Sequence, residues 1–188
     1  PLARDKGSFG LTDDVAVLSK AKGYHFIVST DMLISEVHFF SNDDPEDIAS
    51  KCIRVNISDI VSKGAIPKYY FLSIALPKET DDKWIKSFTK SLKIEQKNFN
   101  ISLMGGDTVS TTGPLTINIV CIGVIEKNKL IRRNGAMPGE DIYVTGEIGS
   151  AKIGLEILKK NIIANSDLEN YFIKKYRLPC PRNKLGPE

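Results

Sequence analysis

Phe26-Ile27-Val28-Ser29-Thr30-Asp31 is the stretch on which the fold prediction rests. Its first three residues are typical of a β-strand, and they would bring two hydroxyls and a carboxylate to the end of that strand. This oxygen-rich group suits Mg²⁺ and polyphosphate, because Mg²⁺ takes few carboxylates and fills its other positions with water and substrate phosphates. The alternative is a strand followed by a polar turn, with Asp31 as a local cap.

Length and composition bound the class of protein. The 188 residues suffice for one hydrophobic core and part of another, and the start at Pro1 leads us to expect a fragment. A net charge of +3 is too small to indicate nucleic-acid binding. Because the sequence has no long apolar run or signal peptide, we expect a soluble, cytoplasmic protein. Cys52, Cys121 and Cys180 lack metal-ligand spacing and are expected to be buried, reduced thiols.

A second acidic group precedes a short strand predicted over residues 15–18. Asp13 and Asp14 are adjacent and repel each other, so a cation should lie beside them. A metal ion is one candidate, and a solvated turn is the alternative. If the next strand, predicted over residues 24–30, is a neighbour, the two acidic groups would come together.

A helix is predicted from Pro45 to Lys63, with an Asp before Pro45 as its cap and a glycine at its end. Asn56 and Asp59 share one face of this helix. A carboxamide and a carboxylate among apolar neighbours need partners. They would either cap a neighbouring loop or face the same metal and phosphate cluster as Asp31.

The next predicted elements are a buried strand over residues 68–77 and a helix over 80–98, whose core side carries Trp84, Phe88 and Leu92. A strand over residues 101–104 then runs into Gly105-Gly106-Asp107-Thr108. Glycines at a strand end let the backbone approach a phosphate, and the adjacent Asp can take a metal. A further strand is predicted over residues 114–125.

The chain changes character after residue 131. A basic, turn-rich linker spans residues 132–140, and an Arg there would either reach a nucleotide phosphate or belong to a solvated hinge. Beyond it we predict a strand at 141–146 and helices at 150–160 and 166–176, the last with Ser166 and Glu169 as a capping box. Too few elements follow for a complete core, so residues 1–131 form the first domain and 141–188 begin a truncated second α+β domain.

The residues alone favour a nucleotide site built around metal ions. The sequence has no P-loop lysine motif and no protein-kinase signature, so a nucleotide would be held mainly through metal ions that bridge its phosphates. In-line transfer of a terminal phosphoryl group would then depend on positioning and charge neutralisation. The residues by themselves leave the acceptor unnamed.

Several motifs in order resemble those of the thiamine-monophosphate kinases, in the superfamily of aminoimidazole ribonucleotide synthetase-like ATP-binding proteins. The resemblance covers essentially the whole chain. The motifs are Gly10-Leu11-Thr12-Asp13-Asp14-Val15-Ala16, Ser29-Thr30-Asp31 with His38-Phe39, Asn56-Ile57-Ser58-Asp59-Ile60 with Gly64-Ala65-x-Pro67, Gly105-Gly106-Asp107-Thr108, Arg133-Asn134-Gly135-Ala136-x-Pro138-Gly139, and Leu178-Pro179-x-Pro181-Arg182.

The resemblance implies an α+β fold with a mixed or antiparallel N-terminal sheet and packed helices, and a homodimer formed through these sheets. It also implies ATP-dependent phosphorylation of thiamine monophosphate to thiamine diphosphate. Several Mg²⁺ ions would be held by Asp14, Ser29, Thr30, Asp31, Asp59 and Asp107. ATP would be contacted by Gly106, Asp107 and Arg133, and the thiamine phosphate by His38. Without the resemblance, His38 would be interpreted as a half-buried imidazole on an aromatic strand.

Some positions depart from the family pattern. Glu36 adds a charge near the substrate, Lys63 stands where Ala or Met is common, and Glu140 replaces a usual Asp. The family's second-domain Asp-Leu-Ser-Asp-Gly-Leu motif would lie beyond Glu188. Two alternatives therefore stay open. One is another ATP-using member of the superfamily, such as formylglycinamidine ribonucleotide amidotransferase, the hydrogenase-maturation dehydratase or, less favoured because no Cys precedes Asp13, selenophosphate synthetase. The other is a truncated, non-catalytic relic that still dimerises.

Overall fold

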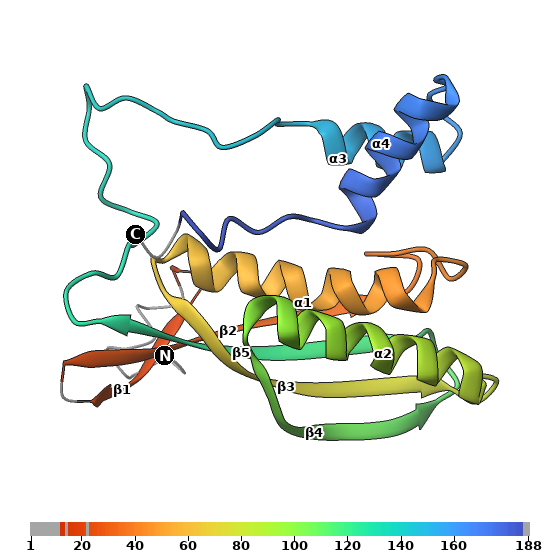
Figure 1. Cartoon of the computed structure of the whole chain (residues 1–188), viewed down its shortest axis with the longest axis horizontal. Helices are drawn as coiled ribbons and strands as arrows, with labels where there is room; N and C mark the ends of the chain where they lie inside the picture. The colour runs from red at the N-terminus through yellow and green to blue at the C-terminus, as the bar shows by residue number, and fades with distance from the viewer. Residues whose placement is uncertain (1–11, 14, 22, 186–188) are drawn as a thin grey trace. The chain divides into compact units, whose positions relative to one another are not determined.

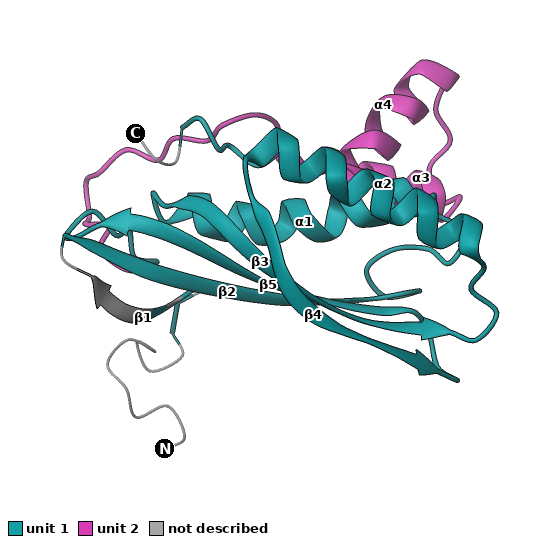
Figure 2. Ribbon diagram, turned by 60° about the horizontal axis from the view of Figure 1, so that its bottom comes forward, with its two compact units in different colours: residues 1–133, 181–188 teal, residues 134–180 magenta. Residues whose placement is uncertain are grey.

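The computed structural model describes residues 12–13, 15–21 and 23–185 (Figure 1). The chain divides into two compact units (Figure 2), the first made of residues 1–133 with 181–188 and the second of residues 134–180. In the described part of the chain, every helix is too short or too polar to cross a membrane.

A mixed five-stranded sheet forms the first unit, with the strand order β1-β2-β5-β3-β4. Its strands are β1 (Ala16–Ala21), β2 (Tyr24–Ile34), β3 (Ile66–Pro77), β4 (Ser102–Thr111) and β5 (Thr116–Glu126). β3 and β4 are parallel because a helix connects them, whereas the other neighbours are antiparallel. The predicted mixed sheet with packed helices, of the α+β class, is confirmed.

Two helices, α1 (Pro45–Ser62) and α2 (Asp82–Phe99), cover one face of this sheet (Figure 2). Alternate residues of β2 and β5 point to that face, because successive side chains of a strand lie on opposite sides. Ile27, Ile117 and Ile119 are therefore fully buried with Ile57 of α1. Phe88 and Leu92 of α2 complete the core, as their spacing predicts, and Trp84 packs at its margin.

The other face of the sheet is apolar and open in the described part of the first unit. Tyr24 and Met32 of β2 are 48% and 53% exposed, and Phe71 of β3 is 39% exposed. The residues between them on β5, such as Val120 and Ile122, are half-buried. An apolar sheet face of this kind is typical of an interaction surface.

Two strands are longer than predicted, so several predicted site residues lie within strands and not after them. β5 pairs with β2 as far as Ile34, so Ser29, Thr30 and Asp31 lie inside the strand and not at its end. The Gly105-Gly106-Asp107 segment likewise lies inside β4, because β3 pairs with β4 up to Thr111. The prediction that these groups follow the strand ends is wrong, since strand pairing continues through them.

The second unit contains a pair of packed helices, α3 (Ser150–Leu158) and α4 (Ser166–Arg177). The strand predicted at 141–146 is not formed: this segment has no pairing partner among the described residues, and Ile142 and Tyr143 are 93% and 87% exposed. The predicted capping box is also wrong. Asn165, and not Ser166, is the N-cap, and its side chain accepts a hydrogen bond from the amide of Leu168 at 3.0 Å.

Candidate functional site

A hydrogen bond between Ser29 and Asp59 joins β2 to α1. The Ser29 hydroxyl donates to Oδ2 of Asp59 at 2.9 Å, and Ser29 itself is buried. Asp31 is two residues further along β2 and therefore lies on the same face of the strand. Of the predicted metal ligands that the structure describes, Ser29 and Asp59 meet between the sheet and α1, and Asp31 lies on the same side of the sheet.

The chemistry of this group fits a hard cation. A hydroxyl and two carboxylates supply oxygen donors, which are what Mg²⁺ prefers, and Mg²⁺ needs only one or two protein carboxylates because water and phosphate oxygens complete its octahedron. Within the described residues, no cluster of three or more His, Cys, Asp or Glu side chains is arranged to hold a metal by itself. Asp14, another predicted metal ligand, lies outside the described residues.

Thr30 and Asp107 lie on the open face of the sheet, opposite Ser29 and Asp31. The Thr30 hydroxyl donates to Oδ1 of Asn118 at 3.2 Å, Asn118 pairs with Ser73, and Ser73 pairs with Asp107. These four residues form a polar row across β2, β5, β3 and β4. Because neighbouring strands lie about 4.8 Å apart, three steps separate Thr30 from Asp107 by about 14 Å. One ion cannot contact both residues within one chain.

The sheet requires the glycine directly before Asp107. Gly106 has a φ of +155°, and a Cβ placed there would lie 1.7 Å from the carbonyl oxygen of Leu72 in β3. Gly106 therefore lets β4 approach β3 closely. The sequence had suggested a different role for this glycine, a close approach of the backbone to a phosphate. Asp107 is exposed, and its Oδ1 accepts the amide hydrogen of Thr108 at 2.9 Å.

Asp13 lies beside cations, as predicted from the repulsion between adjacent acidic residues. The cations are the side chains of Lys63 and Arg132. The Asp13 carboxylate is 3.2 Å from Nζ of Lys63 and 2.7 Å from Nε of Arg132. Burial by itself would raise the pKa of Asp13, but hydrogen bonds from Arg132, the Arg133 backbone and Lys63 outweigh it and lower the pKa to about 2. The carboxylate thus stays charged.

His38 is exposed on the loop that follows β2. Its Nδ1 accepts the amide hydrogen of Ile34 at 3.0 Å, so the proton of the neutral ring is on Nε2. The interpretation of His38 as half-buried on an aromatic strand is therefore wrong. The ring has a fixed orientation and presents an N–H donor, which is the polarity that a phosphate oxygen needs.

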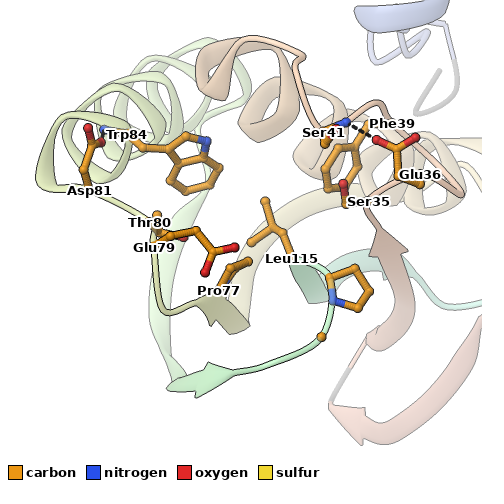
Figure 3. A pocket seen from close by; sticks show the side chains of 12 residues that line it. Ser35, Glu36, Phe39, Ser41, Pro77, Glu79, Thr80, Asp81, Trp84 and Leu115 are labelled. Carbon is orange, nitrogen blue, oxygen red and sulfur yellow. Dashed lines mark hydrogen bonds between the residues drawn. The ribbon is translucent and has the colours of Figure 1, made fainter.

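A pocket of about 520 Å³ opens beside this loop (Figure 3). Its walls come from the loop after β2, the loop before α2 and the loop before β5, and Trp84 and Phe39 contribute aromatic rings. The carboxylate of Glu79 points into it, and Glu36 lies at its rim, where hydrogen bonds from Ser41 lower the pKa of Glu36. Phe39 is buried beneath the pocket, whereas Trp84 is partly exposed, and an indole beside the Glu79 carboxylate favours a cationic ring as the ligand.

Sequence reasoning missed several residues that the fold brings to these surfaces. Asn118 and Ser73 complete the polar row. Each is a polar residue at an outward position of an otherwise apolar strand, and this pattern in the sequence could have identified them. Lys63 was noted only as an unusual residue, although its Nζ contacts Asp13. The cysteine prediction is right for Cys52 and Cys121 and wrong for Cys180, which is exposed.

The fold and these surfaces define an α+β domain with two helices on one face of a mixed sheet and an oxygen-rich group under its first helix. Residues 12–125 match the family model described as AIR synthase related protein, N-terminal domain. This match covers more than half of the chain, so the chain belongs to that family.

Particular relatives narrow the similarity to the thiamine-monophosphate kinases. The kinase of Buchnera aphidicola subsp. Acyrthosiphon pisum is 40% identical over 178 residues, which cover 94% of this chain and 54% of the relative. The chain therefore spans about half the length of the curated relatives it matches. The resemblance seen in the motifs is confirmed.

Solved structures agree with this similarity. The thiamine-monophosphate kinase of Stenotrophomonas maltophilia is 31% identical, with a TM-score of 0.80, and the match covers 100% of this chain and 60% of that one. A structure described as AaThiL complexed with AMPPCP and TMP is 26% identical, with a TM-score of 0.85 and coverage of 97% and 63%.

Proposed function

We propose that this chain contributes the N-terminal domain of a kinase that transfers a phosphoryl group from ATP to thiamine monophosphate in the cytoplasm, forming thiamine diphosphate. The kinase relatives and the related structure named for AMPPCP and TMP support this substrate pair. The observation that carries the proposal is the contact of Ser29 with Asp59, with Asp31 on the same face, because it gathers hard oxygen donors where a metal-bound triphosphate would be held.

Magnesium ions are proposed to bind at two places. Ser29, Asp31 and Asp59 would hold ions on the helix-covered face of the sheet, and Thr30 and Asp107 would hold ions on the open face. Asp14, which lies outside the described residues, is proposed as a further ligand on the family resemblance alone. Bound Mg²⁺ would neutralise the charge of the phosphates during in-line transfer. Arg133 and the backbone at Gly106 and Asp107 are the proposed ATP contacts.

The acceptor is proposed to bind beside the loop after β2. The Nε2–H of His38 would donate to the phosphate of thiamine monophosphate, because its Nδ1 is occupied by the Ile34 amide. The pocket lined by Trp84 and Glu79 would take the thiazolium ring, whose positive charge complements the carboxylate and the indole.

A homodimer formed through the open sheet face is also proposed. Burying an apolar face that includes Tyr24, Met32 and Phe71 would stabilise the pair. Within one chain, Thr30 and Asp107 are about 14 Å apart, too far for one ion to contact both. In the dimer, Thr30 of one protomer could approach Asp107 of its partner across the interface. Light scattering of the purified chain would measure this assembly.

Calorimetry with a non-hydrolysable ATP analogue, with and without Mg²⁺, tests the nucleotide site in this chain. We expect binding that requires Mg²⁺ and that weakens in Asp31→Asn. Formation of thiamine diphosphate from ATP and thiamine monophosphate, against other phosphate acceptors, then tests the reaction in the protein that carries both domains. Turnover of ATP with a different acceptor would contradict the substrate, and dimerisation without nucleotide binding would favour a non-catalytic dimerising protein.

A further inference from the structure

The carboxylate of Asp13 is a buried junction between three parts of the first unit. Its side chain is 1% exposed. It contacts Nζ of Lys63 at the end of α1 at 3.2 Å, Nε of Arg132 at 2.7 Å, and the backbone amide of Arg133 at 3.3 Å. The segment after β5 is therefore tied through one carboxylate to both the N-terminal segment and α1.

A second contact reinforces this junction. The backbone carbonyl of Lys63 accepts the amide hydrogen of Ile131 at 3.1 Å, and the side chain of Lys63 is 5% exposed. Lys63 thus holds the chain at residue 131 by its backbone and Asp13 by its side chain. The backbone from Ile131 to Arg133 has partners at both of its ends.

We propose that Asp13 is a positioning residue for Arg133, fixing the backbone from which that guanidinium reaches the nucleotide. This inference rests on the proposed function, in which Arg133 contacts ATP. The Asp13 carboxylate accepts hydrogen bonds from the Arg133 backbone amide and from the Arg132 side chain. These two bonds fix the position and the orientation of the backbone at residue 133. Precise placement matters because a charged contact with phosphate depends on its geometry.

A neutral residue at position 13 would disturb this arrangement. The Lys63 ammonium, which is almost fully buried, would lose its carboxylate, and an unpaired buried charge draws in water or moves to the surface. Asp13→Asn keeps the size of the side chain and an oxygen for the Arg133 amide but removes the charge that Lys63 and Arg132 share. We therefore expect the segment at 131–133 to loosen without loss of the fold.

The test measures affinity of the 188-residue chain for a non-hydrolysable Mg-ATP analogue in four forms: wild type, Asp13→Asn, Arg133→Met and the double variant. We expect each single variant to weaken binding about tenfold and the double variant to be no weaker than Arg133→Met, because Asp13 acts through Arg133. Additive losses would overturn the proposal, as would wild-type affinity in Asp13→Asn while Arg133→Met is weakened. A wild-type chain that binds no analogue would instead contradict the proposed function.

Two further measurements separate positioning from general destabilisation. Glu95→Gln removes a comparable buried charge from its pair with Arg54, at 2.8 Å between α1 and α2, and is expected to lower stability but leave analogue affinity unchanged. Hydrogen exchange at the Arg133 amide is expected to accelerate in Asp13→Asn and not in Glu95→Gln. Unchanged exchange at that amide in Asp13→Asn would overturn the positioning role whatever the affinity.

Discussion

The hydroxyl of Ser29 lies 2.9 Å from Oδ2 of Asp59, and this hydrogen bond connects the middle of β2 with the last turn of α1. The contact matters because the two residues are 30 positions apart in the chain. A strand and a helix that are only modestly polar by themselves together form an oxygen-rich group beside Asp31. Cys121 of β5 pairs with Ser29 in the sheet, and burial together with the charge of Asp59 raises the pKa of its thiol.

The first prediction concerns this oxygen group. Asp59→Asn is expected to weaken Mg²⁺-dependent binding of an ATP analogue about tenfold or more, because a Mg²⁺ site has few protein carboxylates and loses one full charge. Calorimetric titrations with and without Mg²⁺ measure the effect. Asp82→Asn, in the exposed first turn of α2, is the matched control and should keep wild-type affinity. Equal affinity in all three proteins would exclude Asp59 as a ligand.

Gly106→Ala is expected to destabilise the first unit strongly. The added Cβ would meet the backbone carbonyl of Leu72 at 1.7 Å, and a backbone atom cannot move aside as a flexible side chain can. We expect a loss of about 3 kcal/mol in the free energy of unfolding, measured in urea. Gly113→Ala is the control, because its Cβ would lie 3.4 Å from the Thr111 hydroxyl, and it should be nearly neutral. Similar losses in both variants would contradict the close approach of β4 to β3.

The core under α1 allows a direct comparison of two isoleucines. Ile57 is 0% exposed, and Ile57→Ala should cost about 3–4 kcal/mol of unfolding free energy through lost burial and the cavity left behind. Ile94 of α2 is 46% exposed, so Ile94→Ala should cost less than about 1 kcal/mol. Chemical denaturation of the two variants measures the difference, and a reversed order would refute this account of the core.

Thiol chemistry provides a prediction that depends on pH. Burial raises the pKa of Cys52 to about 12, and burial together with the charge of Asp59 raises that of Cys121 to about 12. Because a raised pKa keeps these thiols protonated, and the thiolate is the reactive form, neither should react with a thiol reagent in the folded protein even at pH 10. Cys180 is exposed and should react quickly. Kinetic labelling with mass spectrometry should find one fast thiol in the native protein and three in denaturant.

The pocket in Figure 3 is tested by Glu79→Gln, which removes a charge from its wall and leaves the shape unchanged. In the two-domain protein, the KM for thiamine monophosphate should rise about fivefold, because the thiazolium loses an opposite charge, while the KM for ATP stays constant. Steady-state kinetics with each substrate varied in turn measures both values. A change in the KM for ATP alone would place the pocket outside the acceptor site.

The sequence by itself determined the elements and the class of fold. Apolar spacing predicted both long helices to within a few residues, since Ile53 and Ile57 in α1 and Phe88 and Leu92 in α2 are each four residues apart. Short β-rich runs predicted the strands of the sheet. These are local signals, because periodicity and propensity act within one segment. The motif series that resembles the thiamine-monophosphate kinases was likewise readable, since its residue types and their order are properties of the chain.

Only the tertiary structure decided which side chains meet. Strand pairing carried β2 past Asp31 and β4 past Asp107, and it placed Ser29 and Thr30 on opposite faces although they are adjacent in sequence. The cations beside Asp13 are the side chains of Lys63 and Arg132, and Arg132 is 119 positions away in the sequence. The strand predicted at 141–146 did not form, because a strand is stable only when another segment supplies its hydrogen bonds. Pairing and register depend on distant partners, and no local pattern contains them.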